Sequence, residues 1–291
     1  MPSSTDLHFN RNAAGVAMVE FFWGLGFPVV MESTFLQIFL KNLGASDTLI
    51  GLVPGILMAG ISLCPLASAY LTRNLGRTMP IVLGMHLLSS LVLLFFGTGL
   101  LFLQEPSHIL PAFFGAYVLF SMTIGFTLPV WLNYLVKIFS AEKNVKGLSI
   151  MYMAQNSAKI LASFFILKVV AVYQFSLVSS AWVFIGAGLL FLVGSFGFLI
   201  TREAVAPPTP DRGGAPGLFS HLRETASRIL GNRNMVYYLL GDLDTYVVIT
   251  IMGFYANYAT GFFQVSQAVA AGFFVTLIYS GAITEIGRAH V

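Results

Sequence analysis

Long apolar runs alternate with short polar connections along most of the chain. Eight of these runs hold about 20 residues or more, the length at which a helix crosses the hydrocarbon core of a bilayer. Backbone polar groups in lipid must be bonded within their own segment, which favours helices over strands at these lengths. The pattern predicts an all-α membrane protein with helices over residues 13–40, 48–71, 79–103, 109–139, 147–172, 175–200, 235–258 and 265–284.

A polar stretch over residues 201–234, containing four prolines, separates the sixth run from the seventh. It divides a predicted six-helix N-terminal bundle over residues 1–200 from the first two helices of a second six-helix bundle over residues 235–291. Part of this linker has apolar residues at helical spacing opposite a charged face. It is interpreted as an amphipathic helix on the membrane surface, with a partner-binding helix as the alternative. The apolar positions are Leu218, Phe219, Leu222, Ala226, Ile229 and Leu230.

Composition agrees with a membrane location. Of the 291 residues, 57% are hydrophobic and only 9% are charged, whereas soluble domains carry about 25% charged residues. The mean hydropathy of +0.82 points the same way. The single cysteine, Cys64, excludes a disulfide framework. The net charge of +3 does not indicate a nucleic-acid partner, because the basic residues lie mostly in the connections between helices.

The positions of lysine and arginine predict the orientation. Cytoplasmic connections are enriched in these residues. Eleven of them lie on the side of the predicted membrane that holds the linker, whereas only Lys41 lies clearly on the opposite side. The sequence therefore predicts a multi-pass protein of the cell (inner) membrane, with the N-terminus and the linker in the cytoplasm. The eleven basic residues on the linker side are Arg11, Arg73, Arg77, Lys137, Lys143, Lys146, Arg202, Arg212, Arg223, Arg228 and Arg233.

Glu20 lies inside the first predicted helix. A charged side chain within a span costs about 2.5–3.5 kcal/mol on insertion scales, so such residues are candidates for function. We expect Glu20 to bind substrate or to exchange a proton during transport. The alternative is a structural acid bonded to a neighbouring helix.

Lys159 lies near the middle of the fifth predicted helix, too far from either end to reach the membrane surface easily. It belongs to a polar stripe at spacings of three and four residues, which we expect to face the bundle interior. A cation there suits an anionic group of a substrate, and a structural ion pair with Glu20 or another acid is the alternative. The stripe consists of Tyr152, Gln155, Asn156, Lys159 and Ser163.

Asp242 and Asp244 lie in the seventh predicted helix. Residues two apart point to different faces of a helix, so one of the two is expected to face the interior. Asp242 is favoured because the tripeptide Asn-Arg-Asn at 232–234 precedes it by the same spacing that separates residues 10–12 from Glu20. No histidine or cysteine cluster accompanies these acids in the sequence, so no metal site is predicted.

Two short segments resemble motifs of the major facilitator superfamily. Gly76 and Arg77, after the second helix, resemble the end of that family's cytoplasmic signature, although Arg73 stands where the family normally has an aspartate. Between the fourth and fifth helices, the family's spaced proline, tyrosine, phenylalanine and glycine are matched by Pro129, Tyr134, Phe139 and Gly147. Six helices, a basic linker and the start of a second set also resemble the family's layout.

The resemblance implies a secondary active transporter, a symporter or an antiporter, that moves a small solute by alternating access. It also implies twelve helices, so the chain is expected to be truncated after about eight, and residues 285–291 are interpreted as non-native. Trp131 and Tyr134 would be additional contacts to the substrate. The expected partners are a small-molecule substrate, a coupling proton or ion and the lipid bilayer. A monomer without a cofactor is expected.

Two other classes of function were considered. A membrane-embedded enzyme would need a catalytic motif such as H-E-x-x-H or G-x-S-x-G, and neither is present in the sequence. A multi-span scaffold without transport activity would not need Glu20 and Lys159 inside its helices. The sequence also contains no phosphate-binding G-x-x-x-x-G-K-[ST] loop, so the energy is expected to come from an ion gradient.

Overall fold

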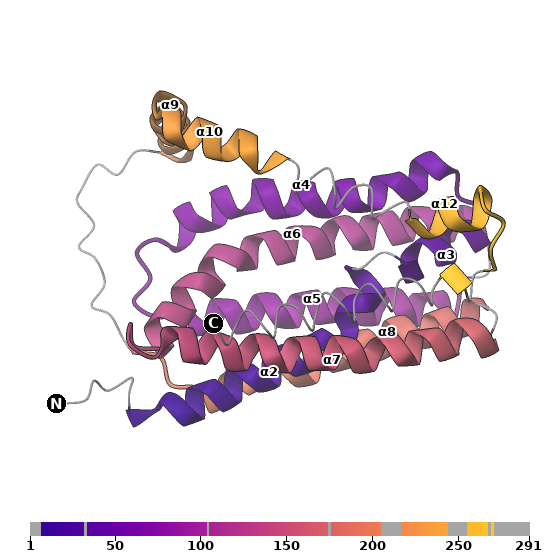
Figure 1. The fold of residues 1–291 in the computed structure, drawn as a ribbon, viewed down its shortest axis with the longest axis horizontal. Coiled ribbons are helices and arrows are strands. Elements are labelled where there is room, and N and C mark those ends of the chain that lie inside the picture. The colour runs from indigo at the N-terminus through magenta and orange to yellow at the C-terminus, as the bar shows by residue number, and fades with distance from the viewer. Residues whose placement is uncertain are drawn as a thin grey trace.

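A computed structural model describes residues 7–31, 34–103, 105–173, 176–204, 217–243, 255–266 and 269–270. These residues form helices and connections, with no strand among them, which confirms the all-α fold (Figure 1). The α-helices are α2 (Phe9–Val30), α3 (Thr34–Asn42), α4 (Asp47–Thr72), α5 (Met79–Leu100), α6 (Pro106–Ile138), α7 (Asn144–Tyr173), α8 (Leu177–Ser195), α9 (Leu218–Gly231), α10 (Arg233–Gly241) and α12 (Tyr255–Gly261), and a 3-10 helix η1 covers Phe196–Ile200.

Five segments within the described ranges are long and apolar enough to cross a membrane, which confirms a multi-pass membrane protein. They are Phe9–Asn42, Asp47–Thr72, Met79–Leu100, Pro106–Ile138 and Leu177–Ile200. Helix α7, with 30 residues, has a length of about 45 Å at 1.5 Å per residue and also reaches across.

The first predicted helix covers α2 and α3, which lie within one candidate span, Phe9–Asn42, and residues 32–33 between them lie outside the described residues. Helix α2 continues through Pro28, which lacks the N–H that would bond to the preceding turn, and ends at Val30. The predicted span over residues 175–200 is helix α8 continued by η1. The predicted helices over 235–258 and 265–284 fall largely on residues that the structure does not describe.

Helices α2 to α8 pack as two units with the same arrangement. Helix α2 packs against α7 and α8, α6 packs against α4 and α5, and α5 packs against α8 (Figure 1). If α2, α4 and α5 are exchanged in this order with α6, α7 and α8, the same pairs of helices remain in contact. The first three helices and the last three are therefore arranged alike. Because each unit has three spans, α2 and α6 run in opposite directions, which is the arrangement of an inverted repeat.

Glycines bring the backbones together at the two equivalent crossings. A Cβ atom on Gly24 of α2 would lie 2.5 Å from the Gln155 carbonyl oxygen of α7. At the crossing of α4 and α6, a Cβ atom on Gly125 would lie 2.0 Å from the Gly60 carbonyl oxygen. Such close approach is possible only without a side chain, as is common between membrane helices. The two crossings therefore determine how far α2 is shifted along its axis relative to α7, and α4 relative to α6.

One end of the bundle, here called the linker end, holds the start of α2, the connections α4–α5 and α6–α7, and residues 201–204 (Figure 1). Helix α9 confirms that the amphipathic pattern forms a helix, and it lies beside α4, where the rings of Tyr70 and His221 are 5.6 Å apart. Its location on a membrane surface stays a prediction.

Candidate functional site

Glu20 lies at the crossing of α2 and α7. It is buried, with 7% of its surface exposed, and it is about 16 Å along the helix from Phe9 at 1.5 Å per residue. The side-chain amide of Gln155 donates a hydrogen bond to its carboxylate. Gly24, one turn further along α2, lets α7 approach closely enough for this contact. The structure thus joins two of the predicted site residues, which are 135 positions apart.

Lys159 lies one turn beyond Gln155 on α7. Its ammonium group attracts the Glu20 carboxylate electrostatically. The Nζ atom also lies 5.6 Å from the centre of the Phe27 ring, within the range of a cation–π interaction. Glu20, which is buried, and Gln155 and Lys159, which are half-buried, therefore form one polar group at the crossing of α2 and α7, here called the charged cluster.

The rest of the α7 stripe divides between interior and surface. Asn156 and Ser163 are buried, and the Ser163 hydroxyl donates to the Lys159 carbonyl oxygen at 2.8 Å. Tyr152 is 49% exposed. The interior part of the stripe thus runs from Gln155 to Ser163, on both sides of Lys159.

Trp131 and Tyr134 lie in a separate aromatic group near the linker end. Their rings stack with centroids 5.6 Å apart, and both contact Phe198 of η1. The Tyr134 hydroxyl forms a short hydrogen bond with the Thr201 hydroxyl. The structure does not bring these two residues to the charged cluster, and their contact with a substrate stays a prediction.

His86 of α5 lies between this aromatic group and α2, a position that the sequence analysis missed. Its ring centre is 4.4 Å from that of Trp23 and 4.7 Å from that of Phe198, and its Nδ1 atom pairs with the Val82 carbonyl oxygen at 2.7 Å. Trp23 in turn stacks on Phe191 at 4.1 Å. A histidine in an apolar run could have been noticed, but its ring neighbours come from three other helical segments, α2, α6 and η1.

Asp242 is the C-terminal cap of α10 and is partly buried, and residues 244–254 that follow lie outside the described residues. Helix α10 lies on the α4 side of the bundle, and α2 and α7 lie on the opposite side (Figure 1). The structure therefore does not bring Asp242 to Glu20, and the proposed role of Asp242 stays a prediction. Asp244 lies outside the described residues.

The signature loop at the linker end is tied down by residues from elsewhere in the chain. The Lys137 ammonium donates to the carbonyl oxygens of Leu75 at 3.0 Å and Gly76 at 3.3 Å. The guanidinium carbon of Arg73 lies 4.2 Å from the centre of the Tyr70 ring, and the Arg77 side chain is exposed. In place of the family's aspartate, Arg73 thus makes a cation–π contact within its own segment.

Glu203 completes this network and was also missed from the sequence. Its carboxylate accepts hydrogen bonds from the Thr78 N–H at 2.7 Å, the Thr78 hydroxyl at 2.6 Å and the Met79 N–H at 2.9 Å, and it lies 3.6 Å from the Lys137 ammonium. These N–H groups begin α5, where a helix lacks internal acceptors. Thr78 before Met79-Pro80 indicates a helix start, but nothing local identifies the acid that serves it.

Comparison with known proteins gives one finding. The chain matches the family model described as Major Facilitator Superfamily over residues 15–288. Neither the curated proteins nor the solved structures contain a significant match.

Proposed function

Because the chain belongs to the major facilitator superfamily of membrane transporters, we propose that it is a secondary active transporter that moves a small solute with an anionic group, coupled to protons, by alternating access. The observation that carries this proposal is the charged cluster of Glu20, Gln155 and Lys159 at the crossing of α2 and α7.

Lys159 is proposed to bind the anionic group of the solute. A cation inside a membrane protein needs a negative partner, and burial in a low-dielectric interior strengthens the attraction. The attraction by Glu20 keeps the ammonium in place when no solute is bound. An arriving carboxylate or phosphate would compete with Glu20 for the same cation.

Glu20 is proposed to couple transport to protons. When the solute takes over Lys159, the Glu20 carboxylate loses its nearby cation and becomes easier to protonate. When the solute leaves, the cation attracts Glu20 again and favours release of the proton. Gln155 holds the carboxylate beside α7 throughout, through the hydrogen bond that it donates.

The remaining predictions complete the proposal. The N-terminus and the linker over residues 201–234 are in the cytoplasm of a cell whose inner membrane holds the protein. Residues 1–200 form one bundle, residues 235–291 begin the second, and the solute binds between the two. The protein acts as a monomer and needs no enzymatic step.

The test is uptake by the purified protein in proteoliposomes, measured over a panel of carboxylate and phosphate solutes with and without a pH gradient. Replacing Lys159→Ala should lower uptake at least about tenfold, because a hydrogen bond to a charged group contributes about 1.5–3 kcal/mol. Lys146→Ala changes an exposed lysine on the same helix and should leave uptake nearly unchanged. Equal uptake by Lys159→Ala and the unaltered protein would refute the proposal.

A further inference from the structure

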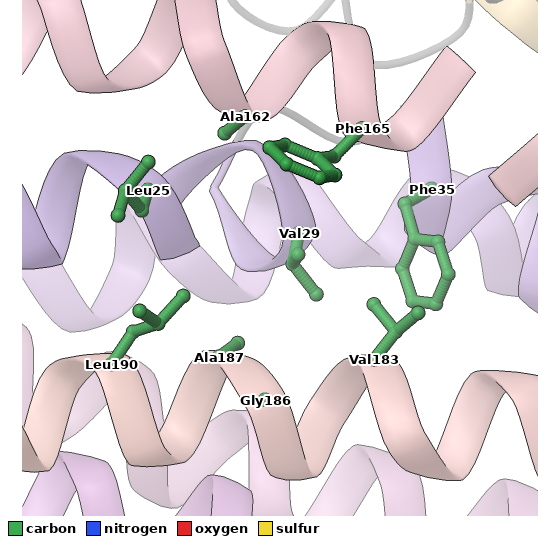
Figure 2. Close-up of a pocket in the computed structure, with 9 residues that line it drawn as sticks. All are labelled: Leu25, Val29, Phe35, Ala162, Phe165, Val183, Gly186, Ala187 and Leu190. Atoms are coloured by element: carbon green, nitrogen blue, oxygen red, sulfur yellow. The ribbon is translucent and has the colours of Figure 1, made fainter. Parts of the chain in front are cut away.

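A crevice lies between α2, α7 and α8, and the residues of the charged cluster are not among those that line it. It has a volume of about 330 Å³, which is within the range of about 300–1,000 Å³ typical of small-molecule sites. Figure 2 shows the side chains that surround it, all of them apolar. The lining residues are Leu25, Val29, Phe35, Ala162, Phe165, Val183, Gly186, Ala187 and Leu190.

The crevice exists because α2 packs closely against both α7 and α8, whereas α7 and α8 are not among the pairs that pack extensively. Small residues deepen it, since Ala162 faces Gly186 and Ala187 across the gap (Figure 2). A Cβ atom built on Gly186 would meet no atom within 4 Å. The wall formed by Phe165 is 70% exposed, so the crevice opens to the outside of the bundle.

The crevice lies in the half of the membrane farther from the linker end. Helix α8 begins at Leu177 at the opposite end of the bundle, and the crevice residues Val183 to Leu190 follow within the next turns. Trp182 stands just before them and is 61% exposed. An exposed tryptophan near the end of a span is typical of the boundary between headgroups and acyl chains. The crevice therefore lies at the depth of acyl chains in that leaflet.

A lysine follows the Phe165 wall of the crevice along α7. Lys168 is three residues beyond Phe165 on α7, toward the end of the helix, and its side chain is exposed. Residues three apart are neighbours on a helix surface. An apolar crevice followed along α7 by a lysine matches a molecule with an apolar chain and an anionic headgroup.

We propose that the crevice between α2, α7 and α8 is a phospholipid site, in which one acyl chain lies between Leu25, Ala162 and Leu190 and the phosphate pairs with Lys168. An acyl chain has apolar surroundings both in the bilayer and in the crevice, so moving it into the crevice gains little hydrophobic free energy. Close packing against the helices and the ion pair between the phosphate and Lys168 would supply the preference for the crevice. The bound lipid would hold α7 against α8 on the side of α2 that faces away from α6.

The test uses the full chain in nanodiscs that contain phosphatidylcholine and a phosphatidylglycerol with a diazirine midway along one acyl chain. After illumination, mass spectrometry maps the labelled peptides. Labelling of residues 162–165 and 183–190 should exceed that of Phe95 and Leu132, which are also exposed, by about threefold or more, as expected for a retained lipid. Even labelling of all exposed apolar segments would overturn the proposal.

Gly186→Leu fills the crevice and should lower this labelling to the level of the reference segments. Gly115→Leu is the matched control, because a Cβ atom on Gly115 of α6 also meets no atom within 4 Å. If Gly186→Leu does not give monodisperse protein, Phe165→Ala removes one wall and should lower labelling as well. Unchanged labelling in both crevice variants would contradict the proposal.

Two further measurements separate the lipid from other occupants. Lys168→Gln should lower labelling by the phosphatidylglycerol probe, and Lys168→Arg should restore it. If a transported solute displaces the label, the crevice belongs to the transport path and the lipid proposal fails. That outcome would leave the proposed roles of Glu20 and Lys159 intact, because they are tested by uptake rather than by labelling.

Discussion

Two carboxylates lie inside the helix bundle, Glu203 at the linker end and Glu20 midway along α2. Both are well buried, since the side chain of Glu203 is 6% exposed and Glu20 is 7% exposed. Glu203 accepts three hydrogen bonds and pairs with Lys137. Glu20 accepts a hydrogen bond from Gln155 and is attracted by Lys159.

The difference lies in the groups that each carboxylate contacts. A carboxylate has about four acceptor positions, and Glu203 fills three of them with the first groups of α5. It acts as a helix cap that also ties residues 201–204 to the start of that helix. Glu20 instead accepts a hydrogen bond from Gln155 of a neighbouring helix and is attracted by Lys159. Similar burial therefore accompanies a structural role at one site and a proposed coupling role at the other.

The largest effect is expected from separating α2 and α7. Gly24→Leu would place side-chain atoms where the Gln155 carbonyl oxygen now lies, 2.5 Å from the Cβ position, so the helices cannot keep their contact. We expect loss of monodisperse protein in size-exclusion chromatography. Gly55→Leu is the control, because a Cβ atom there meets nothing within 4 Å. Normal folding of Gly24→Leu would show that the crossing does not determine the charged cluster.

Removing the hydrogen bond to Glu20 should affect transport rather than folding. Gln155→Met preserves the length of the side chain but cannot donate, and a hydrogen bond to a charged group is worth about 1.5–3 kcal/mol. Uptake in proteoliposomes should therefore fall by about ten- to a hundredfold. The melting temperature should stay close to that of the unaltered protein. A large fall in melting temperature with normal uptake would make Glu20 a structural acid like Glu203.

Glu203→Gln should show the reverse behaviour. The amide retains an acceptor for the start of α5 but loses the charge that pairs with Lys137, and we expect about 1.5 kcal/mol less stability. Thermal unfolding in detergent would show this as a melting temperature lowered by several degrees, with uptake changed less than about threefold. Glu142→Gln, at an exposed acid, serves as the control. Loss of uptake without a change in stability would contradict the structural role.

The smallest effect is expected at the equivalent crossing of α4 and α6. Ser121 precedes Gly125 by one turn, as Glu20 precedes Gly24, and its hydroxyl donates to the Tyr117 carbonyl oxygen of its own helix at 2.7 Å. Such a bond within one helix contributes little to stability, so Ser121→Ala should change uptake less than about twofold and stability by under about 1 kcal/mol. A larger loss of uptake would mean that both crossings contact the solute.

The sequence predicted the features that depend on local pattern. Apolar length identified the spans, charge inside the spans identified Glu20 and Lys159, and helical spacing identified α9. Helix α9 could be predicted without knowledge of distant contacts, because the spacing of apolar and charged residues along the chain is enough to indicate an amphipathic helix. The predicted bounds of α4, α5, α6 and α9 agree with the structure within a few residues, whereas the roles of Glu20 and Lys159 stay predictions.

The sequence could not predict which distant groups meet. The bond from Gln155 to Glu20 joins residues 135 positions apart, and the bonds to Glu203 span about as many. Both depend on the height and rotation of one helix against another, which periodicity does not specify.

The proposed coupling role of Glu20 is tested most directly by comparing two modes of transport in Glu20→Gln proteoliposomes. Glutamine resembles a permanently protonated glutamate, so exchange of labelled for unlabelled solute should continue, whereas accumulation driven by a pH gradient should be lost. The unaltered protein should perform both. Accumulation by Glu20→Gln at the level of the unaltered protein would contradict a role for Glu20 in coupling.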